Sequence, residues 1–358
     1  MLILAFQVIA FAIFNIAMVW ASKKQSNLHK NKQNKFKIAL VIPCYNEERV
    51  IPKKLDNSIA AISFNPQSSI YVVDDGSGDD TFKLAEEYRV KNNLQNLFVW
   101  TNLGESGKPG ALNWVFSKLK EDIVVITDAD ALIEKESICE LASNFYDPRV
   151  GAATGKLVNR GNNSLTQKEE GLYRRVSEFW RKAESNLDSC IIFNGPLMAF
   201  RRELICELKI DERAMADDTD LAYKIRRLGY RSVYEPAAIV SEYITSSFYM
   251  RAKQEIRRAK GLTRVIRENI DMFGKFGYFG KILFPFAILN FVLFPILTLF
   301  LLFLLPFAIM EYPILLASFL LLLIPAVRTA VLGYLYREMA LFIGLVSRSS
   351  GRWKTRRK

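Results

Sequence analysis

Long uncharged stretches flank a mixed polar and apolar body in this chain. Residues 1–21 carry no charged side chain and are long enough to cross a bilayer. A second apolar region, at 282–335, is too long for one helix and is interrupted by Met310-Glu311-Tyr312-Pro313, which divides it in two. The mixed stretch 336–347 is more typical of an interfacial helix. The predicted spans cover residues 1–21, about 283–307 and about 313–335.

The body, residues 37–250, alternates short β-rich runs with helical patterns. The predicted strands are Ile38–Ile42, Ser69–Val73, Asn96–Trp100 and Ile123–Thr127, and the helices between them cover about 47–62, 79–92 and 107–119. Such alternation predicts an α/β fold with a parallel sheet. Ligands bind at the carboxyl ends of the strands in sheets of this kind, and polar or acidic residues follow several of these strands.

The charge distribution predicts how the chain lies in a membrane. The net charge is +12, but residues 38–250 sum to −6, and the excess lies in three blocks of +6 each at 23–37, 251–281 and 348–358. The positive-inside rule then places the body and the C-terminus in the cytoplasm and the N-terminus outside. A cleaved signal peptide is disfavoured because its positive charge would precede the apolar run. The acidic body also argues against nucleic-acid binding.

Residue counts exclude several kinds of chemistry. The only histidine, His29, rules out Ser-His-Asp and multi-histidine metal sites. Four cysteines spread along the chain are too few for a disulfide scaffold, and free thiols are expected in the cytosol. No P-loop or G-x-G-x-x-G motif follows the first strand. Acid–base chemistry therefore depends on carboxylate, Lys, Tyr or Cys side chains.

Two segments offer groups that suit a metal-bound diphosphate. Asp128 and Asp130 stand two residues apart at a strand end, and Mg²⁺ or Mn²⁺ prefers such oxygen ligands. Lys108 lies among three glycines at a helix start, where it can approach phosphate oxygens. A solvated loop and an ordinary flexible loop remain alternatives for the two segments.

Two further acidic pairs have both a structural and a functional interpretation. Asp217 and Asp218 precede an amphipathic helix, so one of them can cap it, and one can serve as a general base. Asp74 and Asp75 begin a turn rich in acidic residues, where a ligand, a metal or a helix N-terminus would offset the repulsion.

Five motifs in order resemble glycosyltransferase family 2, the inverting enzymes of GT-A fold. They are Val41-Ile42-Pro43-Cys44-Tyr45-Asn46-Glu47-Glu48, Val72-Val73-Asp74-Asp75-Gly76-Ser77, Gly107-Lys108-Pro109-Gly110-Ala111-Leu112-Asn113, Thr127-Asp128-Ala129-Asp130 and Asp217-Asp218-Thr219-Asp220-Leu221. The resemblance covers about residues 37–260. The membrane-embedded branch that it resembles includes the hyaluronan, cellulose and poly-N-acetylglucosamine synthases.

The resemblance implies a role for each matching residue. Asp218 would be the catalytic base, and Asp128 and Asp130 would hold Mg²⁺ or Mn²⁺. The donor would be bound by Pro43, Tyr45, Glu47, Asp74, Asp75, Lys108, Asp128, Gln254 and Arg257, and the acceptor by Phe193, Asn194, Gly195 and Asp217. The implied donor is a nucleotide sugar, with UDP favoured over GDP, and the acceptor is a glycan or a lipid-linked molecule.

The resemblance also implies the organisation of the chain. The expected parts are a transmembrane helix at 1–21, a basic linker at 22–36, a GT-A catalytic domain at 37–250, basic interfacial helices at 251–281, two transmembrane helices at 282–335, and an interfacial helix with a basic cytoplasmic tail at 336–358. We expect a multi-pass protein of the cell membrane. A homo-oligomer is left open.

Departures from the family pattern favour limited sugar addition over polymer synthesis. Arg258 stands where the polymerising enzymes carry a Trp that would stack on the acceptor sugar, and Asp217 stands where Glu is usual. Three spans are also fewer than those enzymes use to enclose a channel. Three alternatives stay open: a processive synthase that secretes its product, a non-catalytic scaffold or transport subunit, and a transporter acting through Arg328.

Overall fold

The structure is a computed structural model that describes residues 2–24, 28–32, 35–160, 165–211, 215–243, 248–313, 320 and 323–347. The chain divides into two compact units. Unit 1 comprises Met1–Lys23, Asn162–Ala183 and Thr245–Ser349, and unit 2 comprises Lys24–Gly161, Glu184–Ile244 and Ser350–Lys358.

An eight-stranded mixed sheet forms the centre of unit 2, in the order β3-β2-β1-β4-β7-β6-β8-β5. The strands are β1 (Ile38–Cys44), β2 (Ser69–Asp74), β3 (Leu97–Thr101), β4 (Ile123–Thr127), β5 (Leu132–Ile133), β6 (Val150–Arg160), β7 (Leu197–Arg201) and β8 (Arg231–Tyr243). The first four pair in parallel, as the sequence predicts. β7 is antiparallel to β4 and β6, and β5 is antiparallel to β8.

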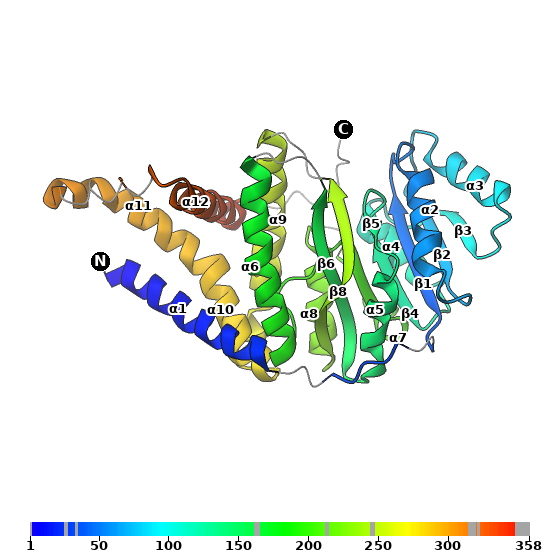
Figure 1. Cartoon of the computed structure of the whole chain (residues 1–358), viewed down its shortest axis with the longest axis horizontal. Coiled ribbons are helices and arrows are strands. Elements are labelled where there is room, and N and C mark those ends of the chain that lie inside the picture. Colours follow the sequence, from blue (N-terminus) through cyan, green and yellow to red (C-terminus); the bar gives the residue numbers. More distant parts are fainter. Residues whose placement is uncertain are drawn as a thin grey trace. The chain divides into compact units, whose positions relative to one another are not determined.

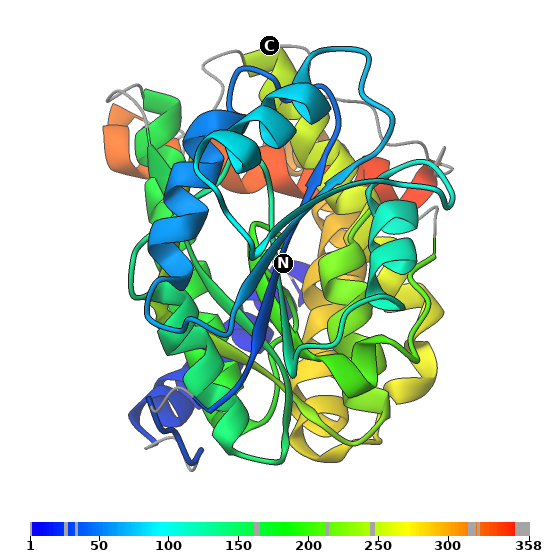
Figure 2. The same cartoon turned by 90° about the vertical axis from the view of Figure 1, so that its right-hand side faces the viewer.

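Helices cover both faces of this sheet, so its central strands are buried on both sides. One core cluster contains residues of α2 (Ile51–Ile62), α3 (Thr81–Lys91) and α5 (Ser137–Ser143). The other contains residues of α4 (Lys108–Phe116), α7 (Arg202–Ile205) and α8 (Asp217–Arg227). Figure 2 shows the blue α2 and the teal α4 on opposite sides of the strands. The carboxyl ends of β1, β2 and β4 therefore open at one edge between the two layers.

Unit 1 is helical. It contains α1 (Leu2–Lys23), most of α6 (Leu165–Leu187), α9 (Phe248–Glu268), α10 (Phe284–Ile288), α11 (Phe294–Glu311) and α12 (Pro325–Val346). Within the part of the chain that the structure describes, two helices are long and apolar enough to cross a membrane by length and composition, Ala5–Lys23 and Phe279–Glu311. Both expose large apolar side chains such as Ile16, Phe303 and Phe307, a surface that lipid would cover. α1 contacts α11 within this unit (Figure 1).

The last helix starts later than the sequence predicts. The predicted span at 313–335 falls in part outside the described residues, and one helix runs from Pro325 to Val346 through the stretch expected to be a separate interfacial helix. Pro325 explains the start, because its fixed φ suits the first turn and it cannot continue a helix from before. Arg328 lies in that first turn and is exposed.

α12 packs closely on α9 within unit 1 (Figure 1). Ala340 and Leu341 share a small apolar cluster with Ala259. A Cβ at Gly344 would lie 2.9 Å from the carbonyl carbon of Ala259, so only glycine lets the two backbones approach this closely. The end of α12 is thus held beside α9.

Candidate active site

Two predicted donor residues brace turns at the end of β2. The Asp74 carboxylate accepts hydrogen bonds from the backbone N and the hydroxyl of Ser77, at 3.1 and 2.5 Å. The Asp75 carboxylate accepts from Asn102 Nδ2 and from the backbone N of Gly107, both at 2.7 Å. Asp75 therefore positions the loop that precedes Lys108. Their predicted contacts with the donor stay predictions.

Lys108 is the first residue of α4 and points into a group of carboxylates. Gly107 before it has φ +104°, a conformation that a side chain would strain. Lys108 Nζ donates to Asp128 Oδ1 at 2.7 Å and lies 3.9 Å from Asp217 Oδ2. Burial alone would lower the pKa of Lys108, but the charges of Asp128 and Asp217 outweigh it and hold that pKa above its usual value. Lys108 is thus a fixed cation in this structure.

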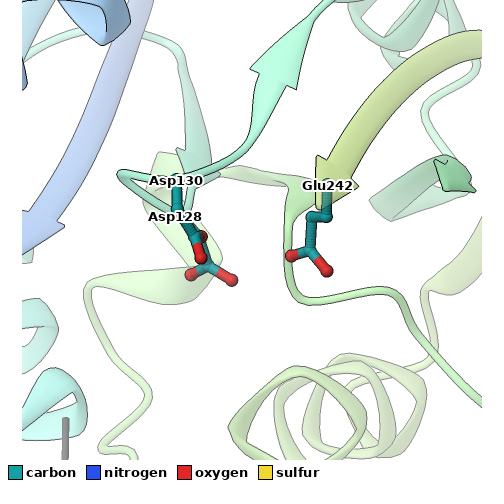
Figure 3. A group of neighbouring side chains, drawn as sticks. All are labelled: Asp128, Asp130 and Glu242. Carbon is teal, nitrogen blue, oxygen red and sulfur yellow. The ribbon is translucent and has the colours of Figure 1, made fainter. Parts of the chain in front are cut away.

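Three carboxylates converge beside this lysine. Each of Asp128, Asp130 and Glu242 offers an oxygen, and these three oxygens lie within 4.8 Å of one another. Figure 3 shows Asp128 and Asp130 on the loop after β4, with Glu242 facing them from β8. Like charges at this spacing repel, and an all-oxygen set of this kind fits a hard divalent cation. The predicted pair of ligands is therefore joined by a third group.

Asp218, the predicted base, lies in the first turn of α8. Burial, and next the charge of Asp217, raise the pKa of Asp218 to about 6, although the backbone N–H of Thr219 and Lys108 act against the shift. The Thr219 N–H donates to Asp218 Oδ1 at 2.7 Å. A Cβ placed on Gly195 would lie 3.2 Å from Asp218 Oδ2, so the glycine leaves this oxygen its space. A carboxylate with this pKa suits proton abstraction near neutral pH.

The other predicted acceptor residues divide into two groups. Phe193 and Asn194 are buried, and Asn194 Nδ2 donates to the Gly155 carbonyl at 2.7 Å, so both support the loop from inside. Gly195 and Asp217 reach the site itself. Asp217 Oδ2 is buried and accepts no hydrogen bond from any described residue. That oxygen lies 3.9 Å from Lys108 Nζ.

Three predicted donor residues lie on or just after β1. Pro43 is buried within β1, and Tyr45 and Glu47 follow it as partly buried residues. The backbone N of Glu47 donates to Thr81 Oγ1 at 2.7 Å, which ties this segment to the start of α3. Gln254 and Arg257 lie on α9, in unit 1. The donor contacts of all five residues stay predictions.

Sequence reasoning missed two residues around the carboxylates. Glu242 lies on β8, a strand that the sequence analysis does not identify, at the end of an apolar run. Lys54 is fully buried, and its Nζ donates to Thr127 Oγ1 and the Ala131 carbonyl. Burial lowers the pKa of Lys54 to about 7, against the charges of Asp128 and other nearby acids. A signal for Lys54 exists, because it lies on the apolar face of its helix, three residues after Ile51.

Sequence comparisons find a matching family and curated relatives. Residues 35–261 match the family described as "Glycosyltransferase like family 2". The chain is 36% identical over 181 residues to a hyaluronan synthase of Streptococcus pyogenes. This match covers 49% of this chain and 43% of that protein. The chain is 27% identical over 228 residues to a poly-β-1,6-N-acetyl-D-glucosamine synthase of Staphylococcus aureus, which covers 63% and 54%. The chain thus spans about half the length of these curated relatives.

One solved structure resembles the chain over nearly its whole length. It is the mannosyltransferase PcManGT of Pyrobaculum calidifontis in complex with GDP-Man and Mn²⁺. The TM-score is 0.80 at 26% identity, and the match covers 96% of each chain. The predicted fold is confirmed by this match together with the family assignment.

Proposed function

The chain belongs to glycosyltransferase family 2 and is a glycosyltransferase. We propose that it carries out a metal-dependent, inverting transfer of sugar from a nucleotide-sugar donor to a glycan or lipid-linked acceptor. The observation that carries this proposal is the arrangement around Asp218. The Asp218 carboxylate, with a pKa of about 6, lies next to Gly195. The preceding residue, Asp217, lies beside the ion pair that Lys108 forms with Asp128.

Asp218 would act as the base. At neutral pH most of its carboxylate is ionised, so it can take the proton of an acceptor hydroxyl as that oxygen attacks the anomeric carbon. Attack opposite the departing diphosphate inverts that carbon. The Asp217 carboxylate, whose side chain is 17% exposed, would accept a hydrogen bond from the acceptor and orient it.

Asp128, Asp130 and Glu242 would hold the divalent cation. Such a cation neutralises charge that develops on a leaving nucleoside diphosphate. Lys108 holds Asp128 in place and adds positive charge on the same side of the site. A Mn²⁺ in the similar mannosyltransferase supports a metal here, and it leaves the choice between Mg²⁺ and Mn²⁺ to experiment.

The donor nucleotide has two candidates. The first candidate is the UDP-linked donor that the resemblance to the family implies. The whole-length similarity to a mannosyltransferase bound to GDP-Man favours GDP-mannose as the second candidate. Both belong in the first donor panel.

We propose limited addition rather than processive synthesis. Arg258, which stands where the resemblance implies a Trp, is 44% exposed and pairs with Glu255 at 3.2 Å on the same helix, and it has no aromatic ring on which a sugar could stack. Family membership together with the assembled carboxylates argues against a non-catalytic scaffold.

We also propose a multi-pass membrane protein whose catalytic unit and C-terminus face the cytoplasm. The basic blocks support this orientation, since all of them lie beside apolar segments. Packing of α12 along α9 supports a tail on the same side as α9. Labelling of a tag at either terminus in intact cells tests this orientation, and a C-terminal tag labelled from outside contradicts it.

The decisive experiment measures nucleoside diphosphate release by the purified protein in lipid. It is incubated with Mn²⁺ or Mg²⁺ and a panel of UDP- and GDP-linked sugars, with and without EDTA. We expect release with one donor and loss of release with EDTA. Absence of release with every donor contradicts the proposed function, and a ladder of long products contradicts limited addition.

A further inference from the structure

Lys54 is a buried lysine with no direct role in the scheme above. Its side chain is fully inaccessible on α2, and Nζ donates to Thr127 Oγ1 at 2.9 Å and to the Ala131 carbonyl at 2.6 Å. Both acceptors are neutral, and Lys54 makes no ion pair with a carboxylate among the described residues. Burial of an ammonium or amine in a core is costly unless its hydrogen bonds are satisfied. Its position therefore calls for a local explanation.

The two acceptors of Lys54 bracket the metal-binding loop. Thr127 is the last residue of β4, and Ala131 is the residue immediately before β5. Between them lie Asp128 and Asp130, and the backbone N of Ala131 donates to the Asp128 carbonyl at 3.2 Å. The amino group of Lys54 thus bonds to both ends of a short turn. This turn carries Asp128 and Asp130, two of the three carboxylates. A neutral amine could also donate both hydrogen bonds, so this bracing does not depend on protonation.

α2 also fixes the strand that leads to the third carboxylate. One turn after Lys54, Asn57 Nδ2 donates to the Ile133 carbonyl at 2.7 Å, and Asn57 Oδ1 accepts from the Ile133 N–H at 2.8 Å. Ile133 belongs to β5, which pairs with β8 at Leu132↔Ser241 and Ile133↔Val240. Glu242 follows Ser241 directly in β8. Lys54 and Asn57 therefore hold the turn and the neighbouring strand from one helix.

We propose that Lys54 is a positioning residue that holds the Thr127–Ala131 turn so that Asp128 and Asp130 face Glu242 before a divalent cation arrives. This inference rests on the proposed function, since it concerns the same metal site. Residues behind metal ligands orient them, and their replacement typically weakens metal binding ten- to a hundredfold. A charge effect alone would act the other way, because removing a nearby cation makes an acidic site more attractive to a metal.

The test measures Mn²⁺ binding to the full-length protein in lipid, without donor, from the free Mn²⁺ signal in electron paramagnetic resonance. Lys54→Met removes both hydrogen bonds at nearly constant length, and we expect the Kd for Mn²⁺ to rise about tenfold. Lys53→Met is the matched control, because Lys53 is the preceding residue of the same helix and is exposed. Thr127→Val removes one of the two acceptors without a large change of shape, and we expect a smaller loss in the same direction.

The outcomes separate this inference from the proposed function. If the unmodified protein binds no Mn²⁺, the metal dependence of the proposed function fails. If it binds Mn²⁺ and Asp130→Asn abolishes binding, but Lys54→Met binds as tightly or more tightly, only the positioning role is overturned. A lower melting temperature of Lys54→Met with unchanged Mn²⁺ affinity overturns it as well, since that is what a purely structural lysine would show. An equal loss in Lys53→Met has the same consequence.

Discussion

Replacement of Asp218 by asparagine should make the protein more stable and almost inactive. The folded environment raises the pKa of Asp218 from 3.8 to about 6. A shift of about two units corresponds to ~3 kcal/mol of disfavoured ionisation at neutral pH. The side chain is still partly exposed, and its place in the first turn of α8 favours a negative charge, so we expect a gain of about 1–2 kcal/mol.

The size of this effect depends on pH in a defined window. The carboxyl group costs no stability below pH 3.8, where both the folded and the unfolded chain are protonated; the cost grows between 3.8 and about 6, where only the unfolded chain ionises, and is full above about 6. The gain in Asp218→Asn should therefore be full at pH 7.5 and shrink toward pH 4.5. Asparagine keeps an oxygen for the Thr219 N–H, so the helix start is preserved.

Thermal unfolding followed by tryptophan fluorescence in detergent measures the stability change. We expect the melting temperature to rise by about 2–8 °C at pH 7.5. Asp80→Asn is the control, because Asp80 stands at the N-cap of α3, as Asp218 lies in the first turn of α8, but Asp80 is exposed, and its change should be close to zero. Nucleoside diphosphate release by Asp218→Asn should fall 10²- to 10⁴-fold. A destabilised Asp218→Asn protein contradicts the unfavourable charge at Asp218, and a fully active one contradicts its role as the base.

Three further predictions follow from close contacts. Gly195→Ala places a Cβ 3.2 Å from Asp218 Oδ2, so kcat should fall about tenfold with little change of melting temperature; unchanged kcat contradicts this. Glu242→Gln should weaken Mn²⁺ binding at least tenfold and reduce the rise in melting temperature that Mn²⁺ gives; calorimetry showing equal affinity would remove Glu242 from the site. Gly344→Ala should destabilise unit 1 by about 1–3 kcal/mol, whereas Gly333→Ala, with nothing within 4 Å, should be neutral or stabilising; equal effects contradict the close α9–α12 contact.

The first half of unit 2 follows closely from its sequence. The four predicted strands are β1 to β4, and β4 matches its predicted bounds at Ile123–Thr127. These strands are buried on both faces, so each is an unbroken apolar run that ends at a polar turn. The second half is less readable, because β6 and β8 are long and only partly buried, and β8 contains Pro236 and changes register at Gly155/Lys156 of β6.

The roles of the acidic motifs divide in a similar way. The pair Asp128 and Asp130, and one of Asp217 and Asp218 as a base, could be proposed from their positions after a strand and at a helix start, and the choice of Asp218 came from the family resemblance. The hydrogen bonds that Asp74 and Asp75 accept from neighbouring loops could not be proposed from the sequence. Their partners, among them Ser77 and Gly107, come close only when the turns fold. The start of α12 at Pro325 shows the limit for the apolar regions, where composition predicts length but not the first residue.

The sequence alone indicates the family, the succession of the first four strands along the chain and the carboxylates that are candidates for the site. These features depend on local patterns of a few residues. Only the tertiary structure decided which charges meet. Glu242 is far from Asp128 in the chain and reaches it through the pairing of β5 with β8. Lys54 reaches the same turn because α2 packs beneath it. Electrostatic and hydrogen-bond energies depend on distance in space, which the order of residues does not contain.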